Sequence, residues 1–170
     1  MDEYRRRIQH ALSRNFLDGL DSLPTDELRT LHTDCNQIEN ESSYVRRLIQ
    51  ARLDIMQAEV ERRKTGGSIS DLIARLPEIL AGNGERTATA GVRVSRELAH
   101  DRDVHWGPAL EPAFDGTLAN LPVLSDEELR AAIDALRALE REISDNRRAL
   151  HGVLARIEHE LAGRHKVGLA

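Results

Sequence analysis

The chain has few aromatic residues, a single cysteine and no long apolar run. Aromatic side chains make up 3% of its 170 residues, whereas a compact globule of this size normally uses more aromatic area to fill its core. The lone Cys35 excludes an intramolecular disulfide and a cysteine-based metal cage. No stretch approaches the roughly 18 apolar residues that a membrane span requires. We therefore expect neither a disulfide scaffold nor a membrane protein.

Charge is abundant but nearly balanced. Charged residues make up 31% of the chain, with 24 Lys and Arg against 29 Asp and Glu, which gives a net charge of −5. Abundant charge with few aromatics is typical of long helices that bury a narrow apolar stripe. The acidic total argues against direct DNA binding. The basic cluster at residues 5–7 has no apolar run behind it, which predicts no secretory signal and favours the cytoplasm.

Glycine and proline divide the first part of the chain into two helical segments. Residues 1–21 carry apolar residues at helical spacing and predict a short amphipathic helix from about Glu3 to Gly19. Residues 22–66 predict a long helix, because neither glycine nor proline occurs from Thr25 to Thr65. Forty helical residues span about 60 Å, and the glycine pair that follows is a natural stop.

The second part of the chain begins with a linker and ends with another long helix. Residues 67–123 are rich in glycine and proline and predict an irregular linker with one short helix at about 70–80. Residues 124–165 predict the second long helix, which is expected to end near Ala162. It opens with Ser125 and Glu128, the spacing of a capping box.

The two long helices are copies of one unit at an offset of 101 residues. Apolar matches are expected between any two amphipathic helices, but polar identities on a solvated face are not, so the polar matches indicate internal duplication. The pairs are Glu27 with Glu128, Arg29 with Arg130, Glu39 with Glu140, Ser43 with Ser144, Arg46 with Arg147, and Glu59 with Glu160. The sequence therefore predicts an all-α protein in which two repeat-related helices form an antiparallel two-helix coiled coil.

The first copy carries a ladder of polar residues. It consists of Glu39, Ser43, Arg46, Gln50 and Asp54. At about 100° per residue these side chains stay within a stripe roughly 80° wide, and the stripe covers about 22 Å of helix. Apolar residues lie one position before several of these polar residues and form an apolar seam beside the ladder. We therefore expect the ladder at the edge of the helix–helix seam.

The second copy repeats this ladder in part. Glu140, Ser144 and Arg147 keep the spacing, and the pattern continues with His151 and Ala155 where the first copy has glutamine and aspartate. A neutral imidazole can donate a hydrogen bond as a glutamine does, and a protonated one can contact a phosphate. Alanine cannot accept a hydrogen bond, so the second half of a site would read its ligand less strictly or borrow an acceptor such as Glu158.

The residue types of the ladder are suited to a guanine nucleotide. The arginine fork fits guanine O6 and N7 or a phosphate in bidentate fashion. A carboxylate such as Asp54 can accept from the guanine N1–H and N2 amino groups together. Ser43 and Gln50 can donate to a phosphate, a sugar or a base. The ladder therefore indicates a site for a guanine-containing anion.

The spacing of Glu39, Ser43, Arg46, Gln50 and Asp54 resembles the full signature of the RsiG-like family of actinobacterial anti-sigma factors. Five positions at about 5% usage each would match by chance on the order of once in ten thousand sequences. The resemblance implies an antiparallel helical pair that binds an intercalated dimer of cyclic di-GMP, one ligand molecule per motif. In that state the protein would sequester a WhiG-type sporulation sigma factor, so that RNA polymerase cannot use it, and would thereby repress transcription. Two motif copies on one chain imply that a monomer assembles both halves of the site.

Other interpretations remain open from the sequence. The ladder can also be the polar flank of a structural or adaptor coiled coil without a small ligand. A nucleotide-processing enzyme is a third reading, although no Ser-His-Asp, P-loop or paired-carboxylate arrangement stands out, and we expect no catalysis. His32 and Cys35 lack the second cysteine of zinc-binding anti-sigma factors, so no metal is expected. Gly152, which aligns with Ala51, either admits a flat ligand or is a neutral replacement.

Overall fold

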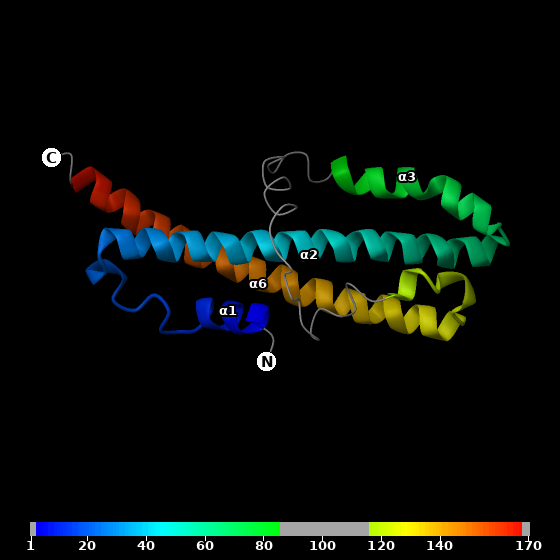
Figure 1. The fold of residues 1–170 in the computed structure, drawn as a ribbon, viewed down its shortest axis with the longest axis horizontal. Helices are drawn as coiled ribbons and strands as arrows, with labels where there is room; N and C mark the ends of the chain where they lie inside the picture. The colour runs from blue at the N-terminus through cyan, green and yellow to red at the C-terminus, as the bar shows by residue number, and fades with distance from the viewer. Residues whose placement is uncertain (1–2, 86–115, 168–170) are drawn as a thin grey trace.

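The computed structural model describes residues 3–85 and 116–167, and the regular elements within these ranges are all helices. Two of them are long, α2 (Thr25–Thr65) and α6 (Asp126–Val167). They run in opposite directions and pack along each other (Figure 1). The prediction of an all-α fold built on two antiparallel helices is confirmed.

Buried residues at every seventh position fill the α2–α6 seam. A heptad repeat keeps one face of each helix turned toward its partner along the whole contact. On α2 these residues are Leu28, Cys35, Ser42, Ile49 and Met56, and on α6 they are Leu129, Leu136, Ile143, Leu150 and Ile157; none is more than 2% exposed. Each α2 member lies 101 positions before its α6 counterpart, so the duplicated unit supplies both sides of the core.

The long helices begin and end largely where their capping residues predict. Gly66 takes the left-handed conformation with φ +69°, which favours glycine, and α2 ends there. At the start of α6 the Ser125 amide donates to the Glu128 carboxylate at 2.7 Å, and the Glu128 amide donates to Ser125 Oγ at 3.2 Å. The end of α6 was predicted incorrectly, because the helix continues through Gly163 to Val167.

Arg164 explains this extension of α6. Its guanidinium donates to Glu160 one turn earlier and to the backbone carbonyls of Leu20, Asp21 and Leu23. These bonds fasten the last turns of α6 to the chain that leads into α2. A glycine in a helix costs about 1 kcal/mol relative to alanine, which such contacts offset.

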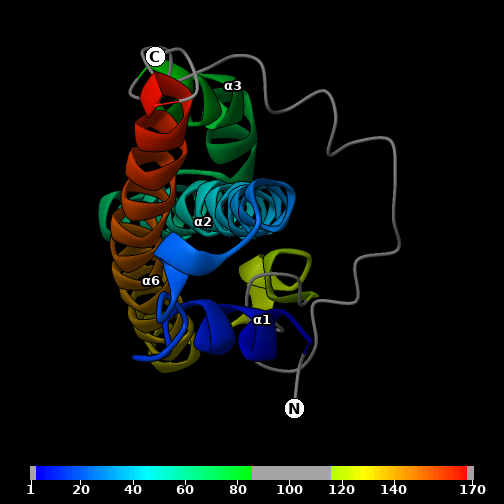
Figure 2. The ribbon, with the colours of Figure 1, turned by 90° about the vertical axis from the view of Figure 1, so that its left-hand side faces the viewer.

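Two shorter helices flank α2 on opposite sides, α1 (Glu3–Ala11) and α3 (Ile69–Glu85) (Figure 2). The predicted end of α1 near Gly19 is wrong. The Ser13 hydroxyl donates to the His10 carbonyl at 2.8 Å and ends the helix, and the chain continues in turns whose apolar side chains still pack on the core. The spacing was therefore right about burial but not about helicity.

The described parts of the segment between the long helices contain more helix than predicted. α3 extends beyond 70–80 despite Pro77, since Leu72 is buried and Ile79 packs against the core on the far side of the proline. Two 3₁₀ turns, η3 (Gly116–Leu118) and η4 (Leu121–Val123), precede α6. The rest of the predicted linker, residues 86–115, lies outside the described residues. None of the described helices is long and apolar enough to cross a membrane.

The duplication also includes the turn before each long helix. η1 (Leu20–Ser22) precedes α2 as η4 precedes α6, at the same offset of 101 residues. Arg63, at the end of α2, donates to the Leu121 carbonyl at 2.9 Å, and Arg164 donates to the Leu20 carbonyl at 3.0 Å. An equivalent arginine thus fastens the turn at each end of the helical pair. The sequence analysis did not predict these contacts.

Candidate functional site

The ladders of the two motif copies lie across the α2–α6 seam from each other. Because the helices are antiparallel copies, an approximate twofold relation brings the glutamate of each copy to the arginine of the other. Eight side chains form the cross-seam network: Glu39, Ser43, Arg46, Gln50, Glu140, Ser144, Arg147 and His151. From the sequence we expected these residues to face a ligand. The contacts that they make with one another were not predicted.

Glu39 is the acceptor at one end of the network. Its Oε1 atom accepts from Ser43 Oγ at 2.9 Å on the same helix. From α6, the same atom accepts from Arg147 Nη2 at 2.7 Å and faces His151 Nε2 at 3.1 Å. One carboxylate thus holds the arginine and the histidine of the other copy in place.

Glu140 has the equivalent role at the other end. Its Oε1 atom accepts from Ser144 Oγ at 2.9 Å and from Gln50 Nε2 at 3.3 Å. Arg46 Nη1 lies 3.7 Å from the same atom, which is an ion pair rather than a short hydrogen bond. The Arg46 and Arg147 side chains are 23% and 21% exposed, so both copies place their arginine at the same depth.

The electrostatics of the network favour an additional anion. Burial lowers the pKa of the Arg46 guanidinium, and the positive charge of Arg147 lowers it further. Burial opposes ionisation of Glu39, but hydrogen bonds from Arg147 and Ser43 outweigh it and lower the pKa of its carboxyl. Arg46 Nε is buried and finds no hydrogen-bond acceptor within the described part of the chain. The two neighbouring arginines are therefore each paired with one carboxylate, and the Nε donor of Arg46 is left without an acceptor among the described residues.

The positions beyond the network differ between the copies. Asp54 continues the α2 stripe one turn past Gln50 and is half-buried. Its counterpart Ala155 is exposed and lines a hollow of about 510 Å³ between α6 and the residues around Gly19. At Gly152 an added Cβ would meet no atom within 4 Å in the described structure. No described neighbour requires a glycine there, so both interpretations of this position remain open.

The sequence analysis missed a residue pair that lengthens the stripe. His32 Nε2 lies 3.1 Å from Glu158 Oε1 across the seam. His32 precedes Glu39 by seven residues, two helical turns, so it lies on the ladder face of α2. Glu158, considered from sequence as a substitute acceptor for the second copy, does lie at that end of the ladder. The heptad spacing of His32 was the available signal.

A metal site has no support among the residues described. They contain no group of three or more histidine, cysteine, aspartate and glutamate side chains arranged to hold an ion. Cys35 is buried in the seam, and burial, followed by the charge of Asp34, raises the pKa of its thiol to about 11. A thiol of this kind packs as an apolar side chain.

These features define an antiparallel helical pair with a duplicated polar ladder across its seam. Residues 14–80 and 115–170, which make up more than half of the chain, match the RsiG-like family, and the chain belongs to that family. RsiG-like proteins are regulatory anti-sigma factors and not enzymes. No curated protein matches the chain.

Proposed function

We propose that this chain is an anti-sigma factor that binds cyclic di-GMP along the ladder and in that state sequesters a WhiG-type sporulation sigma factor. The family supports the anti-sigma role and a sigma-factor partner. The identity of the ligand and the type of sigma factor are our proposals beyond the family assignment. Since both ladders belong to one chain, a cytoplasmic monomer supplies both halves of the site.

The state of Arg46 carries the proposal. A buried guanidinium N–H without an acceptor costs free energy, and a ligand that supplies one recovers it. Arg46 and Arg147 lie near enough for the charge of one to lower the pKa of the other. An anion between them relieves this repulsion. A phosphate or the O6 and N7 atoms of guanine are acceptors that match the arginine fork.

The other ladder residues have roles that follow from their contacts. Glu39 and Glu140 hold the arginines and orient them before the ligand arrives. Ser43 and Ser144, which now donate to these glutamates, are donors that a ligand phosphate can use. Asp54 supplies the acceptor for guanine N1–H and N2 in the first half-site. The second half-site has no carboxylate at Ala155.

Alanine variants of the two arginines test the nucleotide site. Arg46→Ala and Arg147→Ala each remove a charged hydrogen-bond donor, which is worth about 1.5–3 kcal/mol, so affinity should fall about 10- to 100-fold. Arg148→Ala is the matched control, because Arg148 is adjacent in sequence yet 82% exposed. Titration calorimetry measures affinity, and circular dichroism checks that helicity is unchanged. Equal affinity in all three variants would refute the assignment.

Copurification tests the partner. A tagged chain should retain a WhiG-type sigma factor from extract when cyclic di-GMP is present and release it when the nucleotide is removed. Retention without any dependence on nucleotide would favour the adaptor coiled coil. Conversion of the dinucleotide during incubation would favour an enzyme.

A further inference from the structure

A second polar face lies on the side of the helical pair away from the ladder. Glu41 and Glu142 each follow their ladder glutamate by two residues, which places them about 200° around their helices. Both contact α1. Arg7 Nη1 donates to Glu41 at 2.8 and 3.0 Å, and Arg5 Nη2 donates to Glu142 at 3.0 Å. α1 thus bridges α2 and α6 on the face opposite the ladder.

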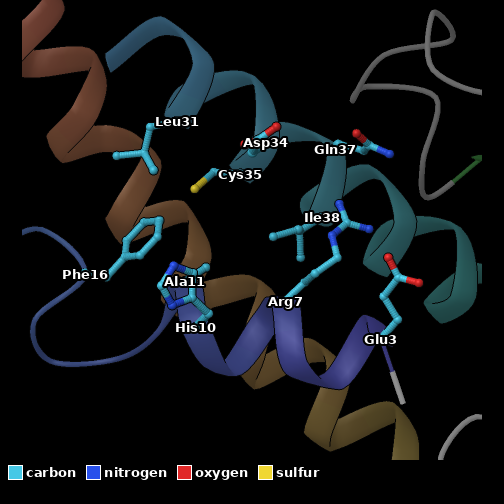
Figure 3. Close-up of a pocket in the computed structure, with 10 residues that line it drawn as sticks. All are labelled: Glu3, Arg7, His10, Ala11, Phe16, Leu31, Asp34, Cys35, Gln37 and Ile38. Carbon is cyan, nitrogen blue, oxygen red and sulfur yellow. The ribbon is translucent and has the colours of Figure 1, made fainter. Parts of the chain in front are cut away.

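The surface beneath α1 is acidic and α1 is basic. Glu41, only 4% exposed, also accepts from Gln37, and Asp34 lies seven residues, about two turns, earlier on the same side of α2. Figure 3 shows Arg7 of α1 and Asp34 and Gln37 of α2 around a shared hollow. We name the surface formed by Asp34, Glu41 and Glu142 the acidic groove. Its charge is complementary to that of a basic amphipathic helix.

α1 is held in this groove by packing as well as by charge, because Tyr4, Ile8 and Ala11 are buried and Tyr4 Oη lies 2.9 Å from Ser42 Oγ. Its helicity depends on these contacts. The helix has nine residues, and isolated helices below about 12–15 residues are marginal in water. It leaves a hollow of about 370 Å³ whose lining includes Ala11 on one side and Leu31 and Cys35 on the other (Figure 3). A larger apolar side chain than alanine would fill this space. The family match begins at residue 14, after α1.

We propose that the acidic groove is a docking site for a basic amphipathic helix of the sigma factor, and that α1 occupies it in the free protein as an intramolecular competitor. The inference rests on the proposed anti-sigma function for the identity of the partner. Because the groove and the ladder lie on opposite faces, a partner helix in the groove leaves the ladder open to nucleotide. A tethered competitor has a high effective concentration, so the partner must bind more tightly than α1 to displace it.

Charge reversal on α1 tests the competition in the full chain. Arg7→Glu replaces the ion pair with the buried Glu41 by a repulsion between two carboxylates and should weaken the docking of α1. Arg6→Glu makes the same change in net charge at an exposed position and is the matched control. With cyclic di-GMP present, the affinity for a purified WhiG-type sigma factor should rise about tenfold for Arg7→Glu and change less than twofold for Arg6→Glu.

Hydrogen exchange then follows α1 itself. In the wild-type chain, the amides of α1 should lose protection when the sigma factor binds, while those of α2 around Glu41 keep theirs. Equal affinities of the two variants, weaker binding by Arg7→Glu, or unchanged protection of α1 in the complex would overturn the inference. Absence of binding in the wild type and in every variant would overturn the proposed function and this inference with it.

Discussion

The paired glutamates of the ladder hold the two half-buried arginines unequally. Glu39 holds Arg147 at 2.7 Å, whereas Glu140 holds Arg46 only at 3.7 Å. The two arginines therefore lie at the same depth, but Arg147 is paired more closely with its glutamate than Arg46 is. Arg46, whose own copy carries Asp54, is the less satisfied of the two arginines. The half-site with the complete motif thus has the greater electrostatic demand for an anion.

Ala155→Asp restores the fifth ladder residue in the second copy. The new side chain has room, since Ala155 is exposed beside an open hollow, and it offers guanine an acceptor that this half-site lacks. Affinity for cyclic di-GMP, measured by titration calorimetry, should increase or stay the same. A loss of tenfold or more would show that the second half-site is assigned to the wrong residues. Ala149→Asp, also exposed on α6, controls for the added charge.

Gly152→Ala separates the two interpretations of the mid-helix glycine. No described atom opposes a Cβ there, so the free energy of unfolding should rise by about 0.5–1 kcal/mol through helix propensity alone. Chemical denaturation measures the change, and Gly163→Ala, equally unobstructed, is the control. If nucleotide affinity falls in Gly152→Ala and not in the control, the glycine makes room for the ligand. If both keep wild-type affinity, it is a neutral replacement.

At the scale of elements, the ends of the helical pair are held by glutamate–arginine contacts, one of them fully buried. Glu59 is fully buried and accepts from Arg62 and Arg63 at 2.6 Å each. Arg63 also reaches Asp126 at 2.8 Å and so ties the end of α2 to the start of α6. Glu160 and Arg164 form the equivalent cluster at the other end. These contacts fasten each end of the helical pair.

Glu59→Gln should destabilise the protein by about 2–3 kcal/mol, because it removes charged hydrogen bonds from a buried site. Hydrogen bonds from Arg62, and then from Arg63, lower the pKa of the Glu59 carboxyl although burial opposes them. Ionisation of Glu59 therefore stabilises the fold above its unfolded pKa of about 4.3, and this contribution is lost as the pH falls through the folded pKa.

Urea denaturation at several pH values tests this prediction. The difference in unfolding free energy between wild type and Glu59→Gln should be largest near pH 7 and shrink as the pH falls below about 4. Glu61→Gln is the control, since Glu61 is exposed and its nearest cation is 3.8 Å away, so it should change stability by less than about 0.5 kcal/mol. A difference that does not depend on pH would contradict the assigned charge state.

Most of the fold was predictable from the sequence because its signals are local or periodic. The absence of glycine and proline from Thr25 to Thr65 predicted α2, and the capping box at Ser125 predicted the start of α6. The repeat predicted that the two helices pair. The end of α1 depends on a hydroxyl–carbonyl bond at Ser13, and the last turns of α6 depend on Arg164 reaching a distant turn. Contacts of the second kind join residues more than a hundred positions apart, and periodicity carries no information about them.

The sequence indicated which residues make up the candidate site, but it did not indicate which of them pair across the seam. The spacing placed the ladder residues on one stripe of each helix, and the family signature named them. The reciprocal pairing of Glu39 with Arg147 depends on the axial register of the two helices, which the core positions set. The buried residues of the seam fix this register, and the register then determines which charges meet.

At the scale of the whole molecule, the helical pair has several distinct faces. The ladder lies on one side of the seam, and α1 contacts the other side through Glu41 and Glu142. α3 packs along α2 on the side away from α1 (Figures 1 and 2). A nucleotide that binds both ladders contacts α2 and α6 at once. It therefore resists separation of the two helices, which is the step that unfolding requires.

Thermal melting measures this linkage directly. A ligand that binds only the native state stabilises it by about 2.7 kcal/mol at a concentration 100 times its dissociation constant. For a chain of this size each kcal/mol raises the midpoint by about 2–4 °C, so saturating cyclic di-GMP should raise it by about 5–10 °C. Cyclic di-AMP is the matched control, because it has the same phosphates but lacks the O6 acceptor and the N1–H donor of guanine. Equal shifts with both nucleotides would mean that the arginines read phosphate alone, and no shift with either would leave the ladder as the flank of an adaptor coiled coil.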